Sequence, residues 1–173
     1  MKTIVIYNSK TGFTQRYAEW LSEALVCECV EVKEASKKNL GKYDAVVFGS
    51  WCMAGGVAKL AWFKNQVHAL AGKKLVVYVV GGSPAESPDI PVAMERIFSG
   101  KEWSGVKSFY CPGGFNYEKM SLLSKLAMKM FVKTILAKKD ITEDEKKMAE
   151  MISHSYDIAD KKYIKPILAE LGQ

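Results

Sequence analysis

The sequence lacks the features of a membrane-spanning or disulfide-stapled protein. No apolar run approaches the roughly 20 residues that a bilayer-spanning helix needs. Its first residues also contain no apolar stretch of signal-peptide length. The four cysteines (Cys27, Cys29, Cys52 and Cys111) form no CxxC pair and have no histidine at metal-ligand spacing. We therefore expect four reduced thiols, no metal site, and a cytoplasmic protein.

Several motifs of nucleotide and phosphate chemistry are also absent. Neither GxGxxG nor GxxxxGK[ST] occurs, so dinucleotide and ATP sites of those types lack support. No cysteine is followed by an arginine six positions on, as the loop of low-molecular-weight tyrosine phosphatases requires. Asn8-Ser9 and Ser50-Trp51 stand where a receiver domain needs acidic residues. No nucleophile–base pair emerges, and His68 and His154 lie in expected helices, so no catalytic residue is assigned.

What is present is an alternation of strand and helix patterns along 173 residues, a length that suits one domain. Apolar runs rich in Val, Ile, Phe and Tyr predict strands, and a fifth segment alternates apolar and charged residues as an edge strand does: Thr3–Tyr7, Cys27–Glu34, Tyr43–Gly49, Lys74–Val80 and Val106–Cys111. Helical spacing predicts helices over Phe13–Leu25, Gly56–Leu70, Ile90–Phe98 and, after a capping-box sequence at Thr142, through about Ser153. This order predicts an α/β fold, with a mostly parallel sheet and helices on both faces.

The loop after the first strand has the composition of a phosphate site. It contains three hydroxyls and a glycine before the first helix, in the order Ser9, Lys10, Thr11, Gly12, Phe13 and Thr14. The glycine lets the backbone turn, the hydroxyls can donate, and the N-terminus of the helix favours a dianion. We expect Lys10 to point mainly to solvent. A loop that only caps the helix is the alternative interpretation of these residue types.

The pattern Ser/Thr-x-Thr-Gly-x-Thr at this position resembles the FMN phosphate signature of flavodoxins, and every fixed position matches. The resemblance covers residues 1 to about 155. It implies a doubly wound, five-stranded parallel sheet of order 2-1-3-4-5, with FMN as the cofactor. Flavodoxins, which hold FMN where the winding direction of the sheet reverses, are an example of the general rule for ligand sites in such sheets.

Two further loops are expected to surround the flavin ring. The first offers Trp51 as a stacking wall beside small residues, over Ser50, Trp51, Cys52, Met53, Ala54 and Gly55. The second, with Gly81, Gly82 and Ser83, follows the fourth strand and lacks the aromatic residue that flavodoxins usually keep there. We expect Cys52 to be an inert thiol. Phe115 and Tyr117 are candidates to cover the second face of the ring, which otherwise stays open.

Residues 113–141 are expected to form a helical insertion, and residues 156–173 a C-terminal extension. Within the insertion, residues 118–139 form an amphipathic, cationic helix with Lys125, Lys129 and Lys133 at four-residue steps. The helix either packs its apolar side on the sheet or meets a partner or a membrane surface. Its Lys125–Met130 core resembles the menaquinone-dependent protoporphyrinogen oxidase branch of the flavodoxin superfamily. That resemblance implies electron transfer to a membrane quinone.

The sequence therefore predicts an FMN-binding redox protein that carries out electron transfer or oxidoreduction. Whether it works as an enzyme, an FMN-dependent oxidoreductase, is left open by the sequence. A protoporphyrinogen oxidase-like enzyme and an FMN-binding, redox-sensing module without turnover are the alternatives. The partner is expected to be a redox protein or a small-molecule or quinone acceptor, and not nucleic acid. Peripheral membrane contact is expected only through residues 118–139. The formal charge of +6 differs in sign from that of carrier flavodoxins, which are acidic.

Overall fold

The computed structural model describes residues 1–53 and 55–173. Over these residues five parallel strands form the central sheet, in the order β2-β1-β3-β5-β6. The strands are β1 (Thr3–Asn8), β2 (Glu28–Glu31), β3 (Ala45–Met53), β5 (Lys74–Gly81) and β6 (Val106–Pro112). This confirms the predicted α/β fold and its strand order, because the short strand β4 (Gly56–Val57) only adds an antiparallel partner to the end of β3.

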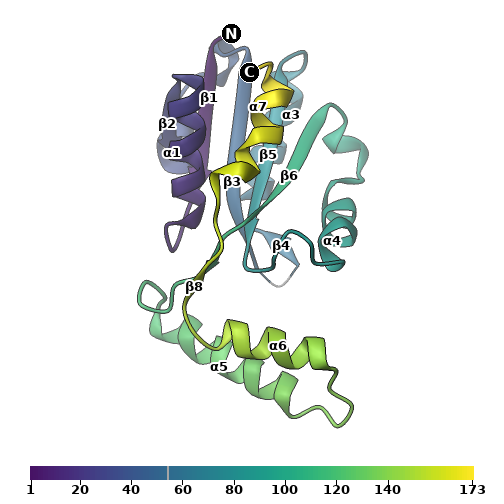
Figure 1. Cartoon of the computed structure of the whole chain (residues 1–173). Helices are drawn as coiled ribbons and strands as arrows, with labels where there is room; N and C mark the ends of the chain where they lie inside the picture. Colours follow the sequence, from purple (N-terminus) through teal and green to yellow (C-terminus); the bar gives the residue numbers. More distant parts are fainter. Residues whose placement is uncertain (54) are drawn as a thin grey trace.

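Helices cover both faces of the sheet, as Figure 1 shows. Alternate residues of each strand enter two separate cores, so that Ile4 and Ile6 face one side while Val5 faces the other. The helices α1 (Phe13–Leu25) and α7 (Lys165–Leu171) pack on one face, and α3 (Leu60–Val67) and α4 (Asp89–Phe98) on the other. Burial on both faces explains why the central strands read as continuous apolar runs. Single turns of 3-10 helix lie at Leu40–Lys42, His68–Leu70, Lys101–Trp103 and Lys161–Ile164.

Three expected element boundaries were wrong. The edge strand stops at Glu31, and Val32–Ala35 form the one-turn helix α2, because Val32 and Ala35 both bury their side chains in the core. Strand β3 continues past Gly49 to Met53 and pairs with β4. Consequently α3 begins at Leu60 and not at Gly56, which belongs to β4.

A helical hairpin projects from the carboxyl end of the sheet (Figure 1). Its helices are α5 (Leu122–Leu136) and α6 (Glu143–Ile152), which share a small core of Ile135, Ala149 and Ile152. A two-stranded antiparallel ribbon, β7 (Gly114–Phe115) with β8 (Tyr156–Asp157), joins the hairpin to the sheet domain. Of the two alternatives for the amphipathic helix, packing of its apolar side on the sheet is wrong, because α5 packs on α6 instead.

The capping box at Thr142 is confirmed, since the Thr142 hydroxyl and the Glu145 carboxylate each bond the other residue's backbone N–H. The helix that it opens belongs to the hairpin, while α7 at the end of the chain supplies Ile167 and Leu171 to the sheet core. None of the helices in the described part of the chain is long and apolar enough to cross a membrane.

Candidate functional site

The loop between β1 and α1 forms an open cradle. Gly12 has a φ of 100°, a left-handed conformation that residues with a side chain rarely adopt. It is the residue directly before the first turn of α1. The Gly12 N–H donates to Ser9 Oγ over 3.1 Å, which closes the loop. No side chain within the described residues caps α1. The first N–H groups of the helix, which have no partner inside a helix, are therefore available to an anion.

The back of this cradle is held by the core of the sheet. Thr14 is buried, and its carbonyl oxygen accepts a hydrogen bond of 3.1 Å from the hydroxyl of Tyr78 on β5. Burial raises the pKa of Tyr78 well above its usual range, so the hydroxyl stays protonated and donates. The Tyr78 ring lies flat against Gly49 on β3, where a Cβ atom would meet its Cζ at 1.8 Å. A glycine at position 49 is therefore what lets Tyr78 reach the first turn of α1.

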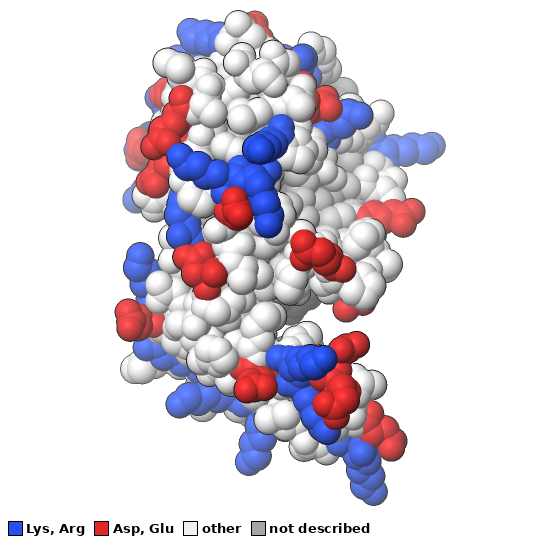
Figure 2. Space-filling view, viewed as in Figure 1, with Lys and Arg blue, Asp and Glu red and all other residues white. Residues whose placement is uncertain are grey.

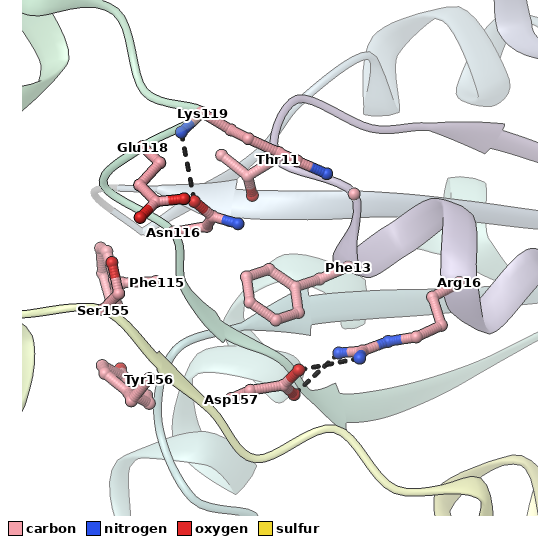
Figure 3. A pocket seen from close by; sticks show the side chains of 11 residues that line it. Thr11, Phe13, Arg16, Phe115, Asn116, Glu118, Lys119, Ser155, Tyr156 and Asp157 are labelled. Atoms are coloured by element: carbon pink, nitrogen blue, oxygen red, sulfur yellow. Dashed lines mark hydrogen bonds and ion pairs between the residues drawn. The ribbon is translucent and has the colours of Figure 1, made fainter.

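Two lysines flank the cradle, and one of them comes from the hairpin connection. Lys119 Nζ lies 3.5 Å from the position that a Cβ on Gly12 would take, and Figure 3 shows the side chain passing beside Thr11. Lys10 instead leans away: its Nζ donates to Ser124 Oγ on α5 over 3.0 Å and lies 5.7 Å from the centre of the Trp51 ring. Lys10 is exposed, as expected, although its ammonium group also bonds to Ser124. Nothing in the sequence pattern near Lys119 indicated its position.

A cavity of about 470 Å³ opens beside the cradle. In Figure 3, Phe13 lies at its centre, between Lys119 with Asn116 and an ion pair of Arg16 with Asp157. Arg16 binds both carboxylate oxygens of Asp157, at 2.8 and 2.7 Å, and these hydrogen bonds lower the pKa of Asp157. Because Asp157 neutralises Arg16, Lys119 is the cation of this cavity without an ion-pair partner among the described residues. From the predicted phosphate loop, the cavity is lined by Thr11, Gly12 and Phe13.

The first expected ring loop is largely strand. Residues Ser50 to Met53 were predicted to be loop, but they extend β3, because Cys52 and Met53 pair with the returning strand β4. Ser50 is buried and links the β3–β4 turn to β1. Its Oγ donates to the Ala58 carbonyl at 2.6 Å and accepts from the Asn8 amide at 3.0 Å. Trp51 is half-buried, and Met53 is 63% exposed.

The turn after Met53 is only partly described. Gly55 has a φ of 77°, and its carbonyl oxygen accepts from Arg96 Nη2 at 3.3 Å. Ala54, which was also predicted to contact the cofactor, lies outside the described residues.

The second ring loop approaches the first one closely. A Cβ on Gly81 would lie 2.8 Å from Cys52 Sγ and 2.6 Å from the Tyr110 hydroxyl, so only glycine fits between them. The Tyr110 hydroxyl also donates to the Ser83 carbonyl over 2.8 Å. Burial raises the pKa of Cys52, which favours the thiol over the nucleophilic thiolate. The fold thus brings together the two loops that the sequence assigned to the ring.

Aromatic residues of the β7–β8 ribbon, which joins the helical hairpin to the sheet, cover Gly82. A Cβ at this glycine would lie 2.4 Å from Phe115 Cε2, and the Tyr156 hydroxyl donates to the Gly82 carbonyl over 2.7 Å. Phe115 was expected in this region, and Tyr117 lies beside it with ring centres 6.5 Å apart. Tyr156 was missed, since it lies 74 positions after Gly82 in a segment interpreted as an extension. The described residues contain no cluster of three or more metal-binding side chains.

The family model of the flavodoxin domain matches residues 4–142. No curated protein matches the chain.

Among solved structures, oxidised flavodoxin 2 from Bacillus cereus is 19% identical, with 65% of this chain and 84% of that one covered and a TM-score of 0.48. The Trp repressor binding protein from Bacillus subtilis is 19% identical, over 66% and 85%, with a TM-score of 0.48. A flavoprotein in complex with FMN from Lactobacillus acidophilus is 15% identical, over 64% and 91%, with a TM-score of 0.40. At these identities and scores the structural likenesses carry no functional information.

Proposed function

Because the chain belongs to the flavodoxin domain family, we propose that it is a redox protein that transfers electrons through FMN. FMN is the cofactor of this domain, and the residues present fit its phosphate. The observation that carries the proposal is the cradle at Gly12. There a left-handed glycine and an uncapped helix N-terminus lie beside Lys119, within a loop that also carries the hydroxyl residues Ser9, Thr11 and Thr14.

Each part of the site has a role in holding the cofactor. Ser9, Thr11 and the first turn of α1 bind the phosphate, with Thr14 fixed from behind by Tyr78. Trp51 offers a wall for the ring. The loop of Gly81 and Gly82 follows the strand that pairs with Trp51, and Cys52, Tyr110 and Phe115 pack against its two glycines. FMN, when bound, supplies a centre that accepts one or two electrons, and the protein sets its position and access.

The flavin exchanges electrons with a redox protein or with a small-molecule or quinone acceptor. The protoporphyrinogen oxidase-like activity is a second candidate. One observation favours it: the bond from Lys10 Nζ to Ser124 Oγ holds the first turn of the inserted helix beside Trp51. The family match supports the flavodoxin domain and not this branch, which rests on the likeness of residues Lys125–Met130 alone.

Purified protein titrated with FMN tests the proposal. We expect stoichiometric binding, seen as a shift of the flavin absorption bands and quenching of flavin fluorescence. The bound flavin, once reduced under anaerobic conditions, should return rapidly to the oxidised form when an artificial acceptor or a quinone is added. Absence of binding with FMN in excess contradicts the proposal. Bound flavin that exchanges no electrons with any acceptor indicates the redox-sensing module instead.

Lys119→Gln is expected to weaken FMN binding by about three- to tenfold at low ionic strength, because one cation beside the phosphate is lost. The effect should shrink at high salt, where ions screen the charge. The measurement is the dissociation constant from fluorescence quenching at two salt concentrations. Lys107→Gln on β6 is the matched control, since it removes one exposed lysine from a strand that carries no cradle residue. Equal affinities for the two variants would show that Lys119 does not act on the phosphate.

A further inference from the structure

Helix α5 presents an unpartnered apolar face at the flavin end of the molecule. Its opposite side packs on α6 through Met128, Val132 and Ile135. Large apolar residues fill the outer side, with exposed fractions of 84% for Leu122, 78% for Leu123, 56% for Leu126, 62% for Met130 and 51% for Phe131. We call these five residues the α5 face. Exposed apolar patches of this kind mark interaction sites in proteins, whereas single exposed residues do not.

Lysine is the one charged residue type within α5 itself, whereas Glu118 precedes the helix and Lys138 after it pairs with Glu145 of α6. Residues 119–139 contain six lysines and no aspartate or glutamate. Within α5, Lys129 and Lys133 are exposed and follow one another along the edge of the apolar residues. The nearest acidic groups after them lie on the connecting loop and on α6, at Asp140 and from Glu143 onward. In Figure 2 the lower rim of the hairpin shows lysines, and acidic side chains gather on the side of α6.

We propose that the α5 face docks on an anionic membrane surface. An apolar stripe bordered by lysines on a helix that lies flat is the pattern of interfacial helices, whose apolar side enters the boundary of head groups and acyl chains. Lysine stems reach past the apolar residues so that their ammonium groups meet lipid phosphates. A second copy of the chain fits less well, because a two-fold contact through this face would set the lysines of both copies against each other.

The α5 face lies close to the loops that are proposed to surround the flavin ring. Ser124, in the first turn of α5, accepts the hydrogen bond of Lys10, and the ammonium group of Lys10 lies 5.7 Å from the centre of the Trp51 ring. In Figure 1, α5 is also the outermost element beyond the carboxyl ends of the strands. Docking through α5 therefore turns the ring loops toward the bilayer. The inference rests on the exposed face and its charge, and it holds whether or not the proposed function does.

The proposal is tested by co-sedimentation of the full chain with lipid vesicles, in the presence of excess FMN. We expect binding to vesicles of phosphatidylcholine mixed with phosphatidylglycerol, much weaker binding to phosphatidylcholine alone, and release by salt. Leu126→Gln/Met130→Gln should lose the apolar contribution, and Lys129→Gln/Lys133→Gln the electrostatic one, each with at least about a tenfold drop in partitioning. All four side chains are exposed, so both variants should fold as the parent does, with unchanged circular dichroism and flavin absorption.

Matched controls remove the same groups elsewhere. Val26→Gln/Val92→Gln deletes two apolar residues, 91% and 67% exposed, after α1 and on α4, and Lys33→Gln/Lys165→Gln removes two exposed lysines on α2 and α7. Both controls should bind vesicles as the parent does. The proposal is overturned if the parent ignores anionic vesicles, or if the α5 variants bind as well as the controls. Concentration-dependent dimerisation that the α5 variants abolish, without vesicle binding, overturns it in favour of a second copy.

Discussion

Gly12→Asp is expected to abolish FMN binding, with a loss of affinity of at least a hundredfold. The new carboxylate would stand in the cradle where the phosphate dianion binds, beside the position that Lys119 Nζ approaches at 3.5 Å. Two like unit charges about 4 Å apart repel by roughly 4 kcal/mol at an effective dielectric constant near 20, and the dianion carries more than one. The measurement is the FMN dissociation constant by fluorescence quenching, together with the flavin absorption of the purified variant.

The control for this variant must reproduce the backbone strain without the phosphate. Gly105 has a φ of 81° and nothing within 4 Å of a Cβ. Gly105→Asp therefore adds the same charge in a similar left-handed conformation directly before β6, at the end of the sheet opposite the cradle. The left-handed conformation itself costs roughly 1–2 kcal/mol in either variant. We expect Gly105→Asp to keep FMN affinity within about twofold of the parent. Normal affinity in Gly12→Asp would place the phosphate somewhere other than this loop.

Gly49→Ala is expected to destabilise the protein by about 3 kcal/mol or more, and to weaken FMN binding as well. The added methyl would stand 1.8 Å from Cζ of Tyr78, whose side chain is fully buried and has no room to turn away. Pushing Tyr78 aside also breaks its hydrogen bond to the Thr14 carbonyl, which fixes the first turn of α1. For a domain of this size we expect a fall in Tm of roughly 6–12 °C, measured by thermal unfolding followed by circular dichroism.

Gly56→Ala is the matched control, because its nearest contact to a Cβ is the Met53 carbonyl oxygen at an ordinary 3.8 Å. It should change Tm by no more than about 2 °C. Adding Tyr78→Leu to Gly49→Ala removes the ring that the methyl meets, so the double variant should lose less stability than the two single losses added together. A Gly49→Ala protein as stable as the Gly56→Ala control would mean that Tyr78 does not pack across Gly49.

The sequence alone determined most of the sheet and the first helix of the site. The β-branched runs of β1, β3 and β5 are apolar on both faces, so they indicated buried parallel strands without knowledge of their partners. Helix α1 runs from Phe13 to Leu25 as its spacing predicted. The phosphate loop was visible because its chemistry is local: hydroxyls, a turning glycine and a helix N-terminus all lie within six consecutive residues.

Only the tertiary structure decided what the rest of the chain contributes. Strand β3 runs on to Met53 because β4 returns to pair with it, a contact that no propensity encodes. Lys119 and Tyr156 reach Gly12 and Gly82 across 107 and 74 positions, and such long-range approaches leave no periodic signal in the sequence. The spacing of α5 predicted an amphipathic helix, but whether its apolar face is covered depends on packing. In this fold α6 covers one side and leaves the other exposed.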